Sequence, residues 1–275
     1  MKLRCGAVPE HFFYPWKVWL NQEAGKNSGW DWREFPGGSG EMLQAMKEGN
    51  LDAAFLLTES AVLARAKGAE IEILFPWVLS PLLWGIFTGK NSQITNLEEG
   101  KTYAISRFTS GSHLMAILEA KGREKEVKDE QWKIAGNLEG AKKMLTEGEA
   151  DLFFWEKWTT KPLVDGGFFR MLDVFPGPWP AFVFCINKNW SDDSNQISEL
   201  KTNYNEVCLL ASKIKNSTAD VCLGISMEYG TNQNDTLDWL NHTRWATSVN
   251  EKLNFLEETE KLMVEAGIIS RETPC

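Results

Sequence analysis

Short apolar runs alternate with helix-like segments through the first two thirds of the chain. Runs of this length predict strands at residues 2–8, 31–35, 51–57, 101–106, 131–135 and 151–155, within 71–88, and near 168–174 and 181–187. Between them, the spacing predicts helices at about 15–24, 40–48, 59–67, 112–121 and 138–147, with a short helix after residue 155. Such alternation is typical of an α/β fold in which mainly parallel sheets are flanked by helices.

The last part of the chain, from about residue 192, has a helical pattern with few strand signals. Ser248 and Glu251 have the spacing of a capping box, so we expect the last helix to begin there and to end before Gly267. We expect this helical tail to pack on the first lobe of the protein.

The longest uncharged stretch, residues 73–88 (ILFPWVLSPLLWGIFT), is too short for a membrane span and contains two prolines. It predicts buried strands joined by a turn.

Two segments 99 residues apart share a pattern that predicts an internal repeat. In A-M-K-E-G-N-L-D-A-A-F-L and M-L-T-E-G-E-A-D-L-F-F-W, the aligned identities are Glu48 with Glu147, Gly49 with Gly148, Asp52 with Asp151 and Phe55 with Phe154. Each segment ends a helix, offers a glycine for a left-handed cap and enters a strand through an aspartate. The same offset aligns the strand starts Lys2 and Lys101.

The repeat predicts two similar α/β lobes joined by two crossing strands. Lobe 1 is expected to contain residues 1–90 and 188–275, and lobe 2 residues 91–187. The predicted crossings, near 85–100 and 183–190, give the topology of a two-strand hinge. The expected fold class is therefore α/β, two-lobed, with a helical C-terminal tail.

Composition narrows the range of partners. The 275 residues are 43% hydrophobic and carry a net charge of −9, so no basic stripe favours nucleic acid. Five dispersed cysteines form no C-x-x-C pair, which indicates reduced, mostly buried thiols, and we expect neither a metal site nor a cofactor. Because no leader pattern opens the sequence, we expect a cytoplasmic protein, or a periplasmic or extracellular one if a leader has been removed.

Candidate ligand residues follow the predicted strands, because ligands of open α/β sheets bind beyond the carboxyl ends of the strands. The first lobe offers His11, Phe12, Tyr14, Gly38, Ser39 and Thr58, and the second Ser110, Gly111, Ser112, His113 and Glu156. Trp155 and Trp179 are the aromatic residues expected to line the pocket. The alternative for each aromatic residue is a place in a core or interface.

Two of these loops, G-G-S-G and T-S-G-S-H, combine glycine and hydroxyl groups at a predicted helix start. Helix starts of this kind suit a carboxylate, sulfonate or phosphate. The alternative is that both loops are ordinary helix caps. Neither is a Walker motif, since no lysine follows the glycines.

The order of these motifs resembles the type II periplasmic-binding-protein fold. The similarity lies in the group that binds nitrate, taurine and aliphatic sulfonates for ABC importers, and in the related thiamine-pyrimidine synthases. The resemblance implies a ligand held between the lobes by Ser39, Thr58, Ser110 and Ser112, with closure on binding. It also implies an ABC permease as partner if the protein is exported. The cysteine-rich motif of the synthases is missing.

We therefore expect a protein that binds a small organic or inorganic anion and catalyses no reaction. The alternative is a cytoplasmic enzyme of the same fold, a lyase or a thiamine- or menaquinone-precursor enzyme, that uses His11, His113 or Glu156 as acid or base. The menaquinone-precursor synthase is expected to carry a histidine where this chain has F-F-W-E, which counts against that alternative. A ligand-sensing regulator is a third hypothesis, although no output domain is visible.

Overall fold

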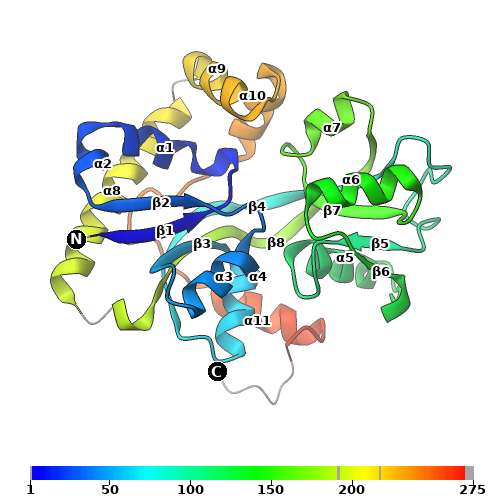
Figure 1. The fold of residues 1–275 in the computed structure, drawn as a ribbon, viewed down its shortest axis with the longest axis horizontal. Helices are drawn as coiled ribbons and strands as arrows, with labels where there is room; N and C mark the ends of the chain where they lie inside the picture. Colours follow the sequence, from blue (N-terminus) through cyan, green and yellow to red (C-terminus); the bar gives the residue numbers. More distant parts are fainter. Residues whose placement is uncertain (1, 191–192, 217, 270–275) are drawn as a thin grey trace. The chain divides into compact units, whose positions relative to one another are not determined.

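The computed structural model describes residues 2–190, 193–216 and 218–269 (Figure 1). Unit 1 comprises the described residues of Met1–Pro81 and Trp179–Lys261, and unit 2 those of Leu82–Pro178 and Leu262–Ser270. The chain enters unit 2 within β4 (Ile71–Gly89) and returns within β8 (Phe169–Asn187). The sequence placed the lobe boundaries after residues 90 and 187, near the ends of these strands, whereas the units divide inside them.

Unit 1 contains a sheet in which three parallel strands meet one antiparallel strand. β1 (Leu3–Ala7) pairs in parallel with β2 (Trp30–Glu34) and β3 (Ala53–Leu57). β8 pairs antiparallel with β3. Because β1, β2 and β3 are parallel, their carboxyl ends lie at one edge, where the next helical segments begin. These segments are η1 (His11–Phe13) with α1 (Tyr14–Asn21), α3 (Ser39–Lys47) and α4 (Thr58–Ala66).

The two faces of this sheet are covered differently because successive strand residues point to opposite sides. Ala54 and Leu56 of β3 face an aliphatic cluster with Met42 of α3. Phe55, between them, contacts the rings of Phe184 and Trp16 at centroid distances of 4.9 and 5.2 Å. Five of the 13 tryptophans lie in this aromatic core, namely Trp16, Trp19, Trp30, Trp32 and Trp77.

Unit 2 repeats this arrangement with fewer residues. β5 (Tyr103–Ile105) pairs in parallel with β6 (Trp132–Ile134) and β7 (Leu152–Glu156), and β4 pairs antiparallel with β7. The core contains Phe87 of β4, Phe153 of β7 and Leu145. The helical segments are α5 (Gly111–Gly122), η2 (Asp129–Gln131), α6 (Leu138–Glu147) and α7 (Lys161–Asp165).

The predicted repeat is confirmed by matching contacts in the two units. Gly49 and Gly148 have φ angles of 72° and 74°, in the left-handed region after α3 and α6. The Asp52 carboxylate accepts the backbone N–H of Arg4 at 2.9 Å, and the Asp151 carboxylate accepts that of Thr102 at 2.9 Å. In each unit, the aspartate thus ties the third parallel strand of the chain to the start of the first.

The prediction of a turn within residues 71–88 is wrong, because β4 is a continuous 19-residue strand. β8 is likewise one 19-residue strand, where two strands near 168–174 and 181–187 were expected. The two prolines of residues 73–88 caused the error in β4. Proline fixes φ near −65°, which extended backbone accommodates, and it disfavours helix in the residue before it. Proline alone therefore does not predict a turn.

The C-terminal part is helical, as predicted. It contains α8 (Ser194–Asn216), α9 (Thr218–Tyr229), α10 (Gln233–His242) and α11 (Phe255–Glu265), and η3 (Lys188–Trp190) precedes them. One further helix, α2 (Glu23–Asn27), follows α1 in unit 1. The prediction of a capping box is wrong. The Glu251 carboxylate accepts a hydrogen bond from the Thr247 hydroxyl at 2.8 Å, and α11 begins only at Phe255. Gly267, with φ of 73°, follows the end of this helix as expected.

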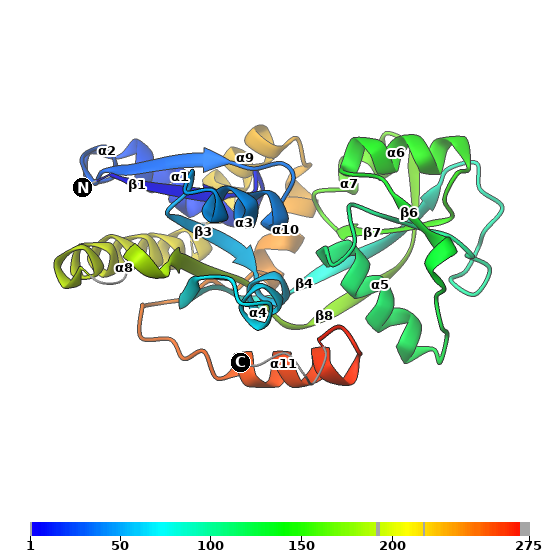
Figure 2. The ribbon, with the colours of Figure 1, turned by 60° about the horizontal axis from the view of Figure 1, so that its bottom comes forward.

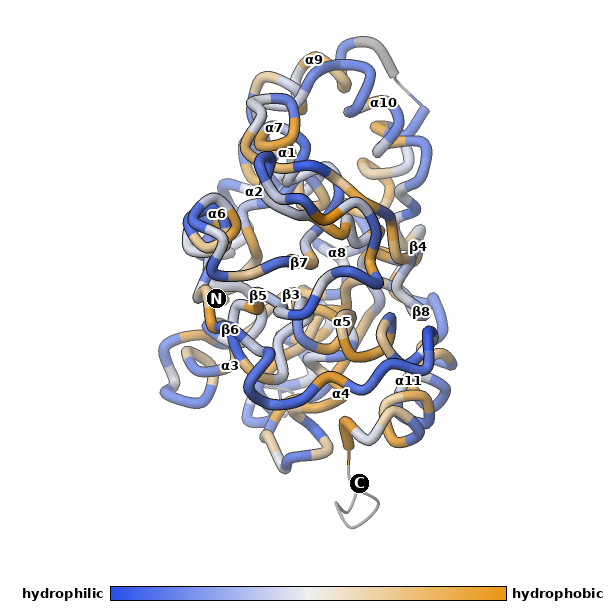
Figure 3. Tube along the Cα trace, turned by 90° about the vertical axis from the view of Figure 1, so that its right-hand side faces the viewer, coloured by the Kyte–Doolittle hydropathy of each residue, from blue (hydrophilic) through white to orange (hydrophobic). Residues whose placement is uncertain are grey.

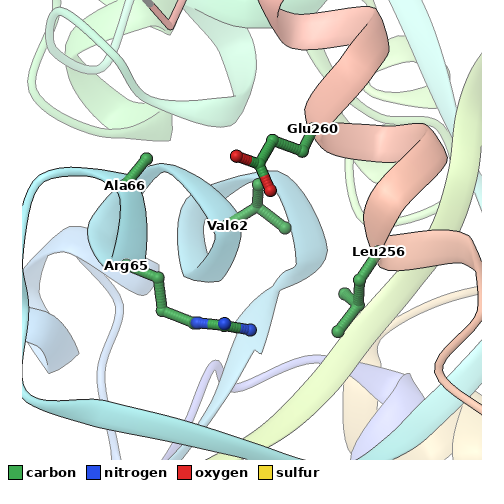
Figure 4. A pocket seen from close by; sticks show the side chains of 5 residues that line it. All are labelled: Val62, Arg65, Ala66, Leu256 and Glu260. Carbon is green, nitrogen blue, oxygen red and sulfur yellow. The ribbon is translucent and has the colours of Figure 1, made fainter. Parts of the chain in front are cut away.

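The first part of α11 packs on unit 1, as predicted for the tail. Leu256 lies against the aliphatic cluster of unit 1, and Figure 2 shows α11 below α4 in that view. Figure 3 shows that α11 has both hydrophilic and hydrophobic positions. A small pocket of ≈ 50 Å³ lies between the two helices (Figure 4). It is lined by Val62, Arg65 and Ala66 of α4 and by Leu256 and Glu260 of α11. The described residues after Lys261 belong to unit 2 instead, where Lys121 donates to the Ala266 carbonyl.

Of the helices in the described ranges, none combines the length and the apolar character that a bilayer crossing needs.

Candidate functional site

The starts of α3 and α4 in unit 1 are tied together by Ser39. Its Oγ accepts the N–H of Leu57, the last residue of β3, at 2.9 Å. Thr58 Oγ1 donates to the Pro180 carbonyl at 2.6 Å, and Gly38, with φ of 74°, precedes α3. The structure therefore brings the predicted residues Gly38, Ser39 and Thr58 to one sheet edge. Among the described residues, the hydroxyl proton of Ser39 has no acceptor and remains a donor, whereas that of Thr58 is donated to the Pro180 carbonyl.

His11 and Phe12, which follow β1, are buried among aromatic rings. The His11 ring lies 4.8, 5.9 and 4.4 Å from the rings of Phe12, Tyr229 and Trp239. Burial lowers the pKa of His11 to about 3, so the imidazole is neutral at pH 7. Tyr14 lies at the start of α1, where burial and the charge of Glu228 raise its pKa.

Trp179, expected as a pocket wall, is buried and makes a specific hydrogen bond. Its Nε1–H donates to Oε2 of Glu59 at 2.7 Å. Glu59 is the second residue of α4 and is itself 1% exposed. Burial raises the pKa of its carboxyl to about 7, although hydrogen bonds from its own backbone N–H and from Trp179 act in the opposite direction.

Three serines gather at the start of α5 in unit 2. Ser110 Oγ donates to the Arg107 carbonyl at 2.6 Å and lies 3.0 Å from Ser112 Oγ. Ser112 Oγ accepts the N–H of Ser106 at 3.0 Å, and the two hydroxyl oxygens are 3.3 Å apart. The hydroxyl proton of Ser110 is therefore donated within the loop and is not available to a ligand. Gly111 and Ser112 supply the first two N–H groups of the helix, which lack a partner four residues earlier.

His113 holds the loop before α5. Its Nδ1 accepts the N–H of Thr109 at 2.9 Å, and Thr109 has a φ of 63°, a conformation that is strained for threonine. The His113 ring meets the edge of Trp132 at a centroid distance of 4.5 Å. Burial lowers the pKa of His113 to about 4, which keeps Nδ1 available as an acceptor.

Glu156 and Trp155 end β7, at the carboxyl edge of unit 2. Glu156 is buried, and its Oε2 accepts the N–H of Thr159 at 2.6 Å. Burial raises its pKa to about 7. The half-buried Trp155 stacks on Phe153 at 5.3 Å.

The parallel strands bring the predicted residues together within each unit. β5 and β7 are parallel neighbours, so the loop carrying Ser110, Ser112 and His113 begins at the same edge as Glu156. Sequence reasoning did not include Ser106 or Glu59 among the ligand-binding residues. Each lies directly beside a predicted feature: Ser106 follows the strand before T-S-G-S-H, and Glu59 follows Thr58.

The described residues contain no group of three or more His, Cys, Asp or Glu side chains placed to hold a metal ion. Cys5, Cys185, Cys208 and Cys222 are buried free thiols, and Cys275 lies outside the described residues. Burial raises the pKa of Cys5 well above its usual value, which disfavours a reactive thiolate.

Comparison with solved structures decides the fold. The CA3427 gene product of Candida albicans, which exhibits the generic periplasmic binding protein fold, superposes with a TM-score of 0.87 at 23% identity. The match covers 99% of this chain and 92% of that one. This chain has the periplasmic-binding-protein fold. The family described as Ca3427-like PBP matches residues 84–174, so the predicted resemblance to periplasmic-binding-protein-like proteins is confirmed.

Two further proteins of this fold are named as sulfonate-binding proteins. The alkanesulfonate-binding protein SsuA from Xanthomonas axonopodis pv. citri, bound to MOPS, has a TM-score of 0.76 at 16% identity and covers 100% of this chain and 94% of its own. The aliphatic sulphonate binding protein SsuA from Escherichia coli has a TM-score of 0.68 at 16% identity, with coverages of 99% and 94%. No curated protein matches the chain in sequence.

Proposed function

We propose that this protein binds a small organic anion, such as a sulfonate or carboxylate, between its two units and closes over it. The observation that carries this proposal is the start of α5, where serine hydroxyls and helix N–H groups gather at the carboxyl edge of parallel strands. A second helix start with a serine, that of α3, lies at the corresponding edge of unit 1. The two SsuA proteins, which have this fold and are named as sulfonate-binding proteins, agree with the proposal.

The hydrogen-bond donors at the start of α5 match an acid group. The N–H groups of Gly111 and Ser112 carry the partial positive charge of the helix start. The Ser106 and Ser112 hydroxyl oxygens are 3.3 Å apart, and when Ser112 donates in that contact the Ser106 hydroxyl can donate to a ligand as well. Three donors on one small region suit the oxygens of a sulfonate or carboxylate better than a cation, which would need acceptors.

Unit 1 offers donors of the same kind. The Ser39 oxygen accepts from Leu57, and its hydroxyl proton has no acceptor among the residues that the structure describes, so it remains a donor. The first N–H groups of α3 belong to Ser39 and Gly40. A ligand that contacts both units gains interactions only in the closed form, and it therefore shifts the equilibrium towards closure.

Titration calorimetry with butanesulfonate, MOPS, benzoate and nitrate tests the proposal. We expect at least one of these anions to bind, and we expect Ser39→Leu combined with Ser112→Leu to weaken binding more than tenfold, because the added side chains cover the helix starts. Ser198→Leu, at an exposed position of α8, is the matched control and should bind as the wild type does. Unchanged binding in the double variant would place the anion elsewhere.

A further inference from the structure

The Glu59 carboxyl group has one oxygen in use and one without a partner. Oε2 accepts the Trp179 indole N–H, whereas Oε1 is shielded from solvent and makes no hydrogen bond to any residue that the structure describes. An unsatisfied buried polar atom destabilises the folded state, and native proteins contain few of them. We therefore ask which bound molecule could form a hydrogen bond with Glu59 Oε1.

Electrostatics decides which form of the carboxyl is present. Burial, the Trp179 hydrogen bond and the backbone N–H of Glu59 account for its pKa of about 7, and no charged side chain of the described residues contributes. With no cation to stabilise the carboxylate, the neutral acid is well populated near neutral pH. In that form, Trp179 can still donate to Oε2 while Oε1 carries a proton.

The position of Glu59 connects this proton to the candidate site. The residue follows Thr58 directly and lies in the first turn of α4, whose start is joined to α3 through the hydrogen bond from Leu57 to Ser39. An ionised Glu59 would repel an anion bound there. A neutral Glu59 would instead add an O–H donor to the N–H and hydroxyl donors of unit 1.

We propose that Glu59 is a ligand-binding residue that donates a hydrogen bond from its protonated carboxyl to the acid group of the ligand, so that the anion binds to the protonated form of Glu59. This inference rests on the proposed function, since it needs an anionic ligand. It restricts the ligand to an anion whose acid group accepts a hydrogen bond, and it makes affinity fall as pH rises.

The test is calorimetry at pH 6, 7 and 8, with each anion of the panel above titrated in two buffers of different ionisation enthalpy. Binding to the wild type should take up about half a proton at pH 7, and affinity should fall about fivefold from pH 7 to pH 8. Glu59→Gln retains a donor and an acceptor but cannot titrate, so it should bind without proton uptake and more tightly than the wild type at pH 8. Glu59→Ala should bind about tenfold more weakly at pH 6.

Glu72→Gln, at an exposed position of β4, is the control for the charge change and should retain the proton uptake. Thermal unfolding checks that each variant is folded. Binding with equal affinity at all three pH values, or proton uptake that persists in Glu59→Gln, would overturn the inference and leave the proposed function intact. Absence of binding by the wild type to every anion would overturn both.

Discussion

Glu59 and Glu156 show how burial changes the chemistry of single residues in this protein. Both are buried at the carboxyl end of the third parallel strand of a unit, and burial raises both pKa values to about 7. His11 and His113 are buried as well, and their pKa values fall to about 3 and about 4. The sequence placed His11, His113 and Glu156 on suitable loops. It could not show burial, which depends on side chains such as Trp239 that lie far away in the chain.

These shifts predict opposite pH dependences of stability. Between pH 4.5 and 7, the folded state binds more protons at Glu59 than the unfolded state does. The contribution of Glu59 to the free energy of unfolding is therefore present below pH 4.5 and is lost as pH rises to 7. For His11, the unfolded state binds more protons between pH 3 and 6.5, so that contribution is lost as pH falls. In the wild type, the two effects partly cancel.

Glu59→Gln separates the two effects. Relative to the wild type, we expect its free energy of unfolding to rise by about 1 kcal/mol per pH unit between pH 5 and 7, because only the wild type loses protonated Glu59. Urea unfolding of both proteins at pH 5, 6 and 7 measures this difference. A constant difference across the three pH values would mean that Glu59 titrates normally.

At the scale of elements, patterns that depend on local backbone geometry could be read from the sequence. The glycine after each repeat helix and the aspartate before each third strand have local roles, so their offset of 99 residues predicted both units. The prolines of β4 misled the prediction, because whether proline is tolerated in a strand depends on its neighbours. The spacing of Ser248 and Glu251 did so too, since Thr247 competes for the same carboxylate.

Gly148→Ala and Gly49→Ala test the local geometry. Both glycines have positive φ, and a methyl group at either position would meet no atom within 4 Å, so the cost is one of backbone strain alone. We expect each substitution to lower the free energy of unfolding by about 1 kcal/mol. Gly122→Ala is the matched control: its surroundings are equally open and no positive φ is required there, so stability should not fall. Equal effects at all three positions would contradict this account.

For the molecule as a whole, the proposal that the protein closes over its ligand is based on how the chain connects the two units. The chain passes between the units within β4 and within β8, and each unit carries its own sheet and core. The two-lobed fold could be predicted because each lobe has the same sequence pattern. The ligand could not, because its identity depends on which donors remain unoccupied after folding, as at Ser106 and Ser39.

Small-angle X-ray scattering, with and without a saturating anion identified by calorimetry, tests the central claim that a small anion is held between the units. We expect a smaller radius of gyration in the presence of the anion, and no change for the variant that combines Ser39→Leu with Ser112→Leu. An unchanged radius of gyration for the wild type, at a concentration where calorimetry shows the site to be filled, would contradict binding by closure.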